Sequence, residues 1–266
     1  MSKTLIPAQR RERIQEYLTI HKIVPSADLS GMLEVSEATI RRDLEWMEGE
    51  GILTRTHGGA ILNQRLQLEA AYQQRAQRNV EEKRLIGALA ATLIEDGDMV
   101  FINSGTTTTQ LIRNIRGGSG ITVITNNLIA TLEVGDAGFE IVLVGGSFQP
   151  MSNAIAGRFA IENISSLYAN KAFIGVDGIT LKHGFTVPAD AEAEMVRVML
   201  DRTNGPVTVI ADHSKWGVVS NFQIARFDQV HKLVVDDKFS STGREALAER
   251  KIEILIACDH PKQSWK

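Results

Sequence analysis

The sequence predicts an α/β protein with two domains, a small helical one followed by a larger doubly wound, mostly parallel one. Its length of 266 residues suits one large or two smaller domains. Residues 1–62 carry the pattern of three short helices and a hairpin. Residues 80–266 alternate short apolar runs with helical segments, which is typical of a parallel sheet covered by helices.

The composition is that of an ordinary folded protein, with 43% hydrophobic and 23% charged residues. The formal net charge of −3 favours neither nucleic acid nor a membrane as a partner. The single cysteine, Cys258, excludes a disulfide framework and is expected to be a small core residue. Six scattered histidines show no metal-ligand spacing. With no signal peptide and no run of about 18 apolar residues, we expect a cytoplasmic protein without a metal or a membrane partner.

Three helices are expected before the hairpin. The first covers about 8–20, the second has Ser26 as its N-cap, and the third is capped by Ser36 and ends at Gly49-Glu50-Gly51. In each helix, apolar side chains recur at the spacing of one helical face. These faces are Ile14, Tyr17 and Leu18; Leu29, Met32 and Leu33; and Ile40, Leu44 and Met47.

Two apolar runs, 52–57 and 60–62, flank Gly58-Gly59 and predict a tight β-hairpin. Three helices followed by a hairpin describe a winged helix-turn-helix, whose third helix can enter the DNA major groove. Arg41 and Arg42 lie off the apolar stripe and can reach phosphates or guanine edges. The candidate DNA-binding residues are Ser36, Glu37, Thr39, Arg41 and Arg42 on this helix, and Arg55 and His57 on the hairpin.

The charge of this first segment sets a condition on DNA binding. Residues 1–62 hold eight cations and nine anions, so they sum to −1, although the arginines cluster at 10–13, 41–42 and 55. One such domain should bind DNA weakly, and we expect a homodimer or homotetramer that binds double-stranded DNA with two or more domains. The alternative is a small helical domain that binds protein.

Residues 63–79 are polar and rich in Gln and Arg, and we interpret them as the linker between domains 1–62 and 80–266. The larger domain is expected to open with a helix at about 80–94. Apolar runs predict strands at 99–102, 121–124, 139–144, 171–174, 207–210, 233–235 and 252–256. Helices are expected between them at 106–116, 128–135, 189–203 and 243–250.

The strands of the larger domain end in small, amide or acidic residues. The strongest case is Ser104 to Thr109, a hydroxyl-rich loop with one glycine between a strand and a helix, where backbone N–H groups and hydroxyls can bind an anion. Ligands bind at the carboxyl ends of strands in such sheets. The alternative is an ordinary capped helix. No dinucleotide fingerprint or P-loop is present, so no nucleotide cofactor is expected.

The chain resembles the DeoR family of bacterial transcriptional regulators. The resemblance rests on the run Val35 to Leu44 (VSEATIRRDL), then Glu50-Gly51, then Thr56 to Ala60 (THGGA), and it continues through nearly the whole chain. It implies a winged helix-turn-helix with its recognition unit at about 24–43. It also implies a sugar-phosphate sensor domain similar in fold to ribose-5-phosphate isomerase, and repression of a carbohydrate-utilisation operon.

The resemblance also assigns effector-binding positions, with either Glu192 or Glu194 on one of the blocks. Asp177 and Glu194 match two acidic positions of the isomerase, but Ile174 replaces a third, so we expect recognition without turnover. The alternative is a sugar-phosphate isomerase with an accessory domain. The residues expected to bind a phosphorylated sugar are Ser104, Gly105, Thr106, Thr107, Thr108, Asn126, Asn127, Gly145, Gly146, Asp177, Glu194 and Lys215.

Overall fold

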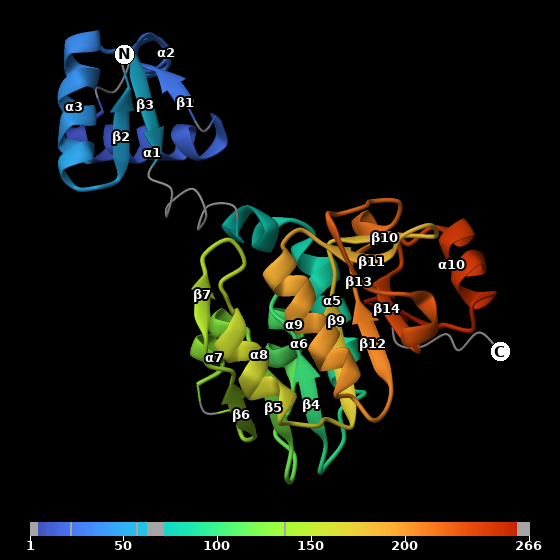
Figure 1. Cartoon of the computed structure of the whole chain (residues 1–266). Helices are drawn as coiled ribbons and strands as arrows, with labels where there is room; N and C mark the ends of the chain where they lie inside the picture. Colours follow the sequence, from blue (N-terminus) through green and yellow to red (C-terminus); the bar gives the residue numbers. More distant parts are fainter. Residues whose placement is uncertain (1–4, 22, 57, 63–71, 136, 260–266) are drawn as a thin grey trace. The chain divides into compact units, whose positions relative to one another are not determined.

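The computed structural model describes residues 5–21, 23–56, 58–62, 72–135 and 137–259. It divides into two compact units, residues 1–74 and 75–266 (Figure 1). Residues 75–79, which their composition groups with the linker, therefore belong to the C-terminal unit. Helices in the described residues lack the length and apolar character of a membrane span.

The N-terminal unit has three helices and a small antiparallel sheet of strand order β1-β3-β2. Ile14, Leu18, Ile40, Leu44 and Met47 are all at most 1% exposed, so the predicted apolar faces of the first and third helices form the core. Its elements are α1 (Pro7–His21), β1 (Ile23–Pro25), α2 (Ser26–Leu33), α3 (Glu37–Gly49), β2 (Leu53–Thr56) and β3 (Gly59–Leu62).

Two predictions about the second helix are wrong. Ser26 is its first residue and not its N-cap, because Pro25 is extended in β1 and the Ser26 amide donates to Gly58 O (2.8 Å). Met32 is 40% exposed, while Leu29 and Leu33 are buried. The sequence did not predict the short strand β1, whose pairing with β3 fixes where α2 starts.

The hairpin is confirmed, with a different role for its second glycine. Thr56 pairs with Gly59, so Gly59 is a strand residue. A Cβ on Gly59 would lie 2.1 Å from Val24 O, so a glycine is needed for the close approach of β1 to β3.

The C-terminal unit is built on a seven-stranded parallel sheet of order β15-β14-β12-β9-β4-β5-β6. The strands are β4 (Met99–Ile102), β5 (Thr122–Thr125), β6 (Glu140–Leu143), β9 (Lys171–Gly175), β12 (Val207–Ile210), β14 (Lys232–Asp236) and β15 (Glu253–Ala257). Each of the seven predicted strands is present, with ends that differ by at most one residue. The predicted α/β class is confirmed.

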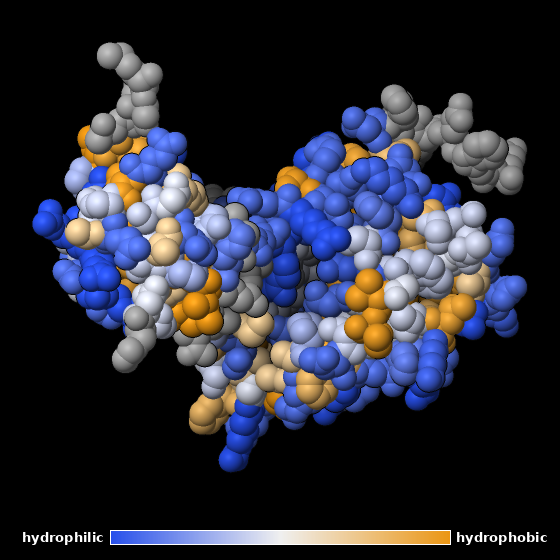
Figure 2. All heavy atoms as spheres, turned by 90° about the horizontal axis from the view of Figure 1, so that it is seen from above, coloured by the Kyte–Doolittle hydropathy of each residue, from blue (hydrophilic) through white to orange (hydrophobic). Residues whose placement is uncertain are grey.

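Helices cover both faces of this sheet. One buried cluster joins the sheet to α5 (Val80–Ala91), α6 (Thr106–Asn114) and α7 (Leu128–Val134). A second cluster joins the other face to α8 (Arg158–Ser165), α9 (Asp190–Asp201) and α10 (Ser241–Ala248). Helix α8 was not predicted. In Figure 2, hydrophobic residues on the visible face form small groups between hydrophilic ones, as on most protein surfaces.

Five further short strands lie outside the main sheet and were not predicted. They form a hairpin of β7 (Ser147–Gln149) and β8 (Ala154–Ala156), and a three-stranded sheet of β10 (Gly178–Thr180), β11 (Gly184–Val187) and β13 (Phe222–Ala225). The expectation that Cys258 is a core residue is wrong. Cys258 is exposed because it follows the last residue of β15, the strand at the edge of the main sheet.

Candidate functional site

A polar pocket of the C-terminal unit opens at the carboxyl ends of the parallel strands. It lies over β4 and β9, which are neighbours in the sheet although the chain continues from β4 to β5 and β6 on one side and from β9 to β12 on the other. This is the point at which an open α/β sheet reverses its strand order, and ligands bind there. The pocket is thus where the topology alone would place a ligand.

The loop from Ser104 to Thr107 forms one wall of the pocket and leads into α6. Its position is fixed by side-chain amides at the ends of neighbouring strands. The Ser104 amide donates to Asn126 Oδ1 (2.8 Å). Asn103 joins β4 to β9, because its Oδ1 accepts from Gly175 N (2.7 Å) and its Nδ2 donates to Gly175 O (3.0 Å). The first N–H groups of α6 have no partner within the helix, so the start of this helix, which lines the pocket, is suited to an anion.

Seven of the twelve predicted effector residues line this pocket. They are Ser104, Gly105, Thr106, Thr107, Asn126, Asp177 and Lys215. Lys215 Nζ lies 3.4 Å from Asp177 Oδ1, so a cation and a carboxylate from different loops meet there. Both groups line the pocket and can contact a bound ligand.

The other five predicted residues do not line the pocket. Thr108 is fully buried and donates to Gly105 O (3.0 Å). Asn127 caps α7 by accepting from Ala130 N (3.0 Å). Gly146 packs against α8, since a Cβ there would lie 2.8 Å from Ala160 Cβ, and Gly145 precedes it beyond β6, at the sheet edge.

The fifth residue, Glu194, is exposed on α9, whereas Glu192 lines the pocket. Two residues along a helix are about 200° apart around its axis, so Glu192 and Glu194 cannot share a face. Burial raises the pKa of Glu192, and the nearby Asp177 carboxylate adds to this. The nearby Ser152 hydroxyl, buried in the same pocket, opposes this rise in the pKa of Glu192.

The second candidate site is the exposed face of α3. Ser36 is its N-cap and accepts from Thr39 N (3.3 Å), as predicted. Arg42 is exposed, and Arg41 lies 3.7 Å from Glu37 in an ion pair that water screens. His57 lies outside the described residues.

Several cations of the N-terminal unit already have acidic partners. Arg10 donates to Asp43, which is 2% exposed, and Arg11 Nε lies 3.0 Å from the other oxygen of Asp43. Arg55 Nη1 lies 3.0 Å from Glu45 Oε1. Two arginines of the cluster at residues 10–13 are therefore used in an ion pair that holds the unit together. The cations on the exposed face of α3 are Arg41 and Arg42.

Comparison with known proteins decides the family. Residues 10–65 match the DeoR-like helix-turn-helix domain, and residues 78–237 match the DeoR C terminal sensor domain. The chain belongs to the DeoR family. The N-terminal unit of this DeoR-family protein is a DNA-binding helix-turn-helix, and the protein is a transcriptional regulator.

Relatives of this DeoR-family protein are transcriptional regulators. The HTH-type transcriptional repressor GlcR of Bacillus subtilis (strain 168) is 33% identical over 93% of this chain and 95% of its own. The lactose phosphotransferase system repressor of Lactococcus lactis subsp. lactis is 36% identical over 65% of this chain and 69% of its own. These relatives do not support the isomerase alternative.

Among solved structures, ribose 5-phosphate isomerase A of Methanocaldococcus jannaschii matches the DeoR-family chain with a TM-score of 0.38 and 16% identity. The match covers 52% of this chain and 55% of the isomerase, which is less than two thirds of its length. A likeness this weak carries no argument about function.

Several pocket residues of this DeoR-family protein were not predicted. Arg75 and Arg78 lie in the segment taken for the linker, and Lys83 lies on α5. The lining residues that the sequence did not single out are Arg75, Arg78, Lys83 and Ser152. Asp212, Ser214 and Glu192, the last as the alternative to Glu194, lie in blocks that the family resemblance covers, and they line the pocket too. With Lys215, the pocket holds four cationic side chains against three carboxylates, those of Asp177, Glu192 and Asp212. This balance suits a ligand that has an anionic end and hydroxyl groups.

Lys83 is a buried cation, 4% exposed, whose Nζ donates to the backbone oxygens of Arg75 and Arg78. Burial lowers the pKa of Lys83 to about 8, although the Asp212 carboxylate opposes the change. The nearby charges of Lys215, Arg75 and Arg78 lower it further. An anion in the pocket would relieve the repulsion among these cations.

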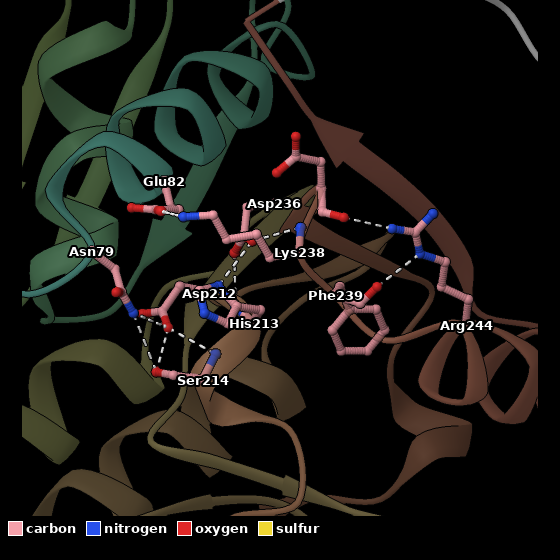
Figure 3. Close-up of polar contacts among 10 residues, drawn as sticks. Asn79, Glu82, Asp212, His213, Ser214, Asp236, Lys238, Phe239 and Arg244 are labelled. Atoms are coloured by element: carbon pink, nitrogen blue, oxygen red, sulfur yellow. Dashed lines mark hydrogen bonds and ion pairs between the residues drawn. The ribbon is translucent and has the colours of Figure 1, made fainter.

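Asp212 connects the pocket to a second polar group behind it (Figure 3). Burial would raise the pKa of Asp212, but hydrogen bonds from Ser214 and Asn79 outweigh burial and hold it below its usual value. Next in the chain, His213 Nδ1 lies 2.9 Å from Asp236 Oδ1. Lys238 pairs with Glu82 of α5. The loops that follow β12 and β14 are thereby fixed to α5.

Raising the pH from 7 to 9 should weaken binding of an anionic ligand by about tenfold, because Lys83 loses its charge around pH 8. Without ligand, the free energy of unfolding should rise with pH, whereas the affinity for the ligand falls. The pKa of Lys83 is lower in the folded than in the unfolded chain, so the unfolded chain binds more protons between about pH 8 and 10.5, and the free energy of unfolding rises with pH in that range. Calorimetric titration with a sugar phosphate at both pH values measures the first effect. A Lys83→Met variant with the same pH dependence as the wild type would contradict the assignment to Lys83.

Proposed function

We propose that this DeoR-family protein represses an operon for carbohydrate use, and that a phosphorylated sugar bound in the pocket changes its affinity for operator DNA. The observation that carries the proposal is the pocket itself. The N–H groups of α6 and four cationic side chains surround a space that three carboxylates also line. Phosphate suits the cations, and sugar hydroxyls suit the carboxylates.

The proposed roles of the side chains follow from their positions. The loop Ser104–Thr107 binds the phosphate through its N–H groups and hydroxyls, together with Lys83 and Lys215. Asp177 and Glu192 accept hydrogen bonds from the hydroxyl groups of the sugar. The names of the relatives support the carbohydrate class, since one of them is a lactose phosphotransferase system repressor.

A thermal-shift screen of phosphorylated and unphosphorylated sugars tests the ligand class. A ligand present at 100 times its dissociation constant should add about 2.7 kcal/mol to the free energy of unfolding. We expect at least one sugar phosphate to stabilise the protein, and its unphosphorylated form to have no effect at the same concentration. Stabilisation by the free sugar alone would contradict a phosphate site.

On the DNA side, we propose that Ser36, Glu37, Thr39, Arg41, Arg42, Arg55 and His57 face the operator, and that a homodimer or homotetramer presents two or more units to it. The charges of residues 1–62 sum to −1, so a single unit would bind DNA weakly. This supports binding by two or more units. Sedimentation of the full-length protein with and without operator DNA measures the assembly.

Arg42→Ala should weaken operator binding by about 5–150-fold, which corresponds to the roughly 1–3 kcal/mol of one arginine contact to a base or phosphate. Arg42 is exposed on α3, so the fold should be unaffected. Gel shifts on the DNA flanking the gene measure the affinity, and thermal stabilisation by the sugar phosphate should be unchanged. The matched control is Arg226→Ala, an exposed arginine of the C-terminal unit paired with Asp228. Equal DNA affinity of the Arg42→Ala and Arg226→Ala variants would remove Arg42 from the interface.

A further inference from the structure

Two residues of the segment 75–79 line the effector pocket, although the segment leads directly to the N-terminal unit along the chain. Arg75 and Arg78 both line the pocket. Arg75 is partly buried, and its Nη2 donates to Met151 O (2.5 Å) in the turn between β7 and β8. Arg78 is exposed, and its guanidinium has no ion-pair partner within the described part of the chain. Two cations of the site thus come from the segment that joins the two units.

The same segment is fixed to the pocket by three further hydrogen bonds. Lys83 Nζ donates to the carbonyl oxygens of both Arg75 and Arg78. Asn79 Nδ2 donates to Asp212 Oδ1 (2.8 Å), as Figure 3 shows. The partners of these bonds, Lys83 and Asp212, are themselves pocket residues. A ligand that contacts Lys83 or Asp212 therefore acts on groups that hold residues 75–79 in place.

Asn79, at the end of this segment, has an uncommon backbone conformation. Its backbone is left-handed (φ 52°, ψ 44°), a conformation that side chains other than Gly and Asn adopt rarely. The turn at Asn79 separates the helical residues 72–77 from α5. The direction in which the chain leaves the C-terminal unit is thus set at a residue with a left-handed backbone, whose side chain is bound to Asp212 of the pocket.

We propose that Arg75 and Arg78 bind the anionic group of the effector, and that residues 75–79 transmit its binding to the N-terminal unit. The proposal rests on the proposed function and adds to it the residues that couple the two sites. An anion in the pocket pairs with both guanidinium groups and so orders the segment. Because residue 74 is covalently joined to residue 75, this ordering restricts the chain that leads to the DNA-binding unit. Coupling between two sites in one protein typically changes an affinity by 5–150-fold.

Amide hydrogen exchange of the full-length protein tests the proposal, with inorganic phosphate as the probe and sodium chloride at equal ionic strength as the reference. Phosphate should slow exchange at Ser104–Thr107 and also at residues 75–80. The Arg78→Gln variant should bind phosphate about tenfold more weakly and lose the slowing at residues 75–80. The matched control is Arg84→Gln. Arg84 is an exposed arginine of α5 that pairs with Glu81 and does not line the pocket, and its variant should behave as the wild type.

The outcomes separate the two proposals. In one outcome, phosphate slows exchange at Ser104–Thr107 but not at residues 75–80. This result would agree with the effector pocket but would overturn the transmitting role of the segment. An Arg78→Gln variant that binds phosphate as tightly as Arg84→Gln does would overturn the binding role of Arg78. If neither phosphate nor any sugar phosphate slows exchange at Ser104–Thr107, both proposals are wrong.

An Asn79→Gly variant tests transmission separately from binding. Glycine accepts the left-handed conformation but removes the hydrogen bond to Asp212. We expect phosphate to bind this variant within about twofold of the wild type, with the effect of the sugar phosphate on DNA affinity reduced at least fivefold. A full effect on DNA affinity would show that the link between Asn79 and Asp212 does not transmit the signal.

Discussion

Asp43→Ala is expected to unfold the N-terminal unit while the C-terminal unit stays folded. The Asp43 carboxylate is buried between α3 and α1, where Arg10 and Arg11 donate to its two oxygens. Arg10 is itself 8% exposed, so removing its partner leaves a guanidinium buried without a counter-charge. Breaking a buried ion pair in this way costs about 3–5 kcal/mol. That is a large part of the stability of a unit this small.

Hydrogen exchange separates the two units in this experiment. Amides of α3 should exchange rapidly in the Asp43→Ala variant, and amides of β4 in the C-terminal unit should stay protected. Glu37→Ala is the matched control on the same helix, since its ion pair with Arg41 is exposed and is worth at most about 1 kcal/mol. Protection of α3 at the wild-type level in the Asp43→Ala variant would show that the ion pair does not hold α1 and α3 together.

Thr106→Asp is expected to abolish the response to the effector. Thr106 is the first residue of α6 and lines the pocket, so the new carboxylate would occupy the space meant for an anion and repel it. The fold should tolerate the change, because Thr106 is partly exposed and an acidic side chain in the first turn stabilises a helix. In wild type, a sugar phosphate at 100 times its dissociation constant adds about 2.7 kcal/mol. In the variant this stabilisation should disappear, together with the effect on operator binding.

The matched control places the same charge at another helix start. Ser241→Asp adds a carboxylate to the first residue of α10, outside the pocket, and should leave the effector response intact. Thr106→Ser keeps the hydroxyl group and should retain binding within a few-fold. A Thr106→Asp protein that still releases operator DNA with the same sugar phosphate would show that the loop Ser104–Thr107 is not the phosphate site.

The main sheet could be predicted from sequence because its inner strands are buried on both faces and all seven form short, largely apolar runs. The five strands outside it could not. Ala154–Ala156 and Gly178–Thr180 are three residues long, and each pairs in a short hairpin with a neighbouring strand, β7 or β11, so neither leaves an alternating apolar pattern in the sequence. Helix α8 is short and carries the exposed Phe159, so its apolar residues do not follow the spacing of one buried helical face. Its sequence is therefore hard to distinguish from that of a loop.

The loop Ser104–Thr107 could be placed at a pocket from the sequence because a strand, a run of hydroxyl residues and a helix follow one another directly. Arg75 and Arg78 gave no such signal, since their approach to the pocket depends on the chain turning at Asn79. Lys83 could have been recognised from the sequence. It occupies the same helical face as Ile86, Gly87 and Ala90, where a lysine is unusual unless it is paired or functional. The choice between Glu192 and Glu194 needed the orientation of α9, which sequence alone does not give.

The strand order of the main sheet has a consequence for how the protein is made. β4 is the first strand of this sheet to leave the ribosome, yet it lies in the interior of the finished sheet, between β5 and β9. It can pair with β5 and then β6 early, but β9 follows about 70 residues after β4 ends. At synthesis rates of about 5–20 residues per second, the apolar edge of Val100–Ile102 stays uncovered on that side for several seconds. Chains that stop before Lys171 should therefore aggregate through this edge, and folding during synthesis depends on keeping it protected until β9 emerges.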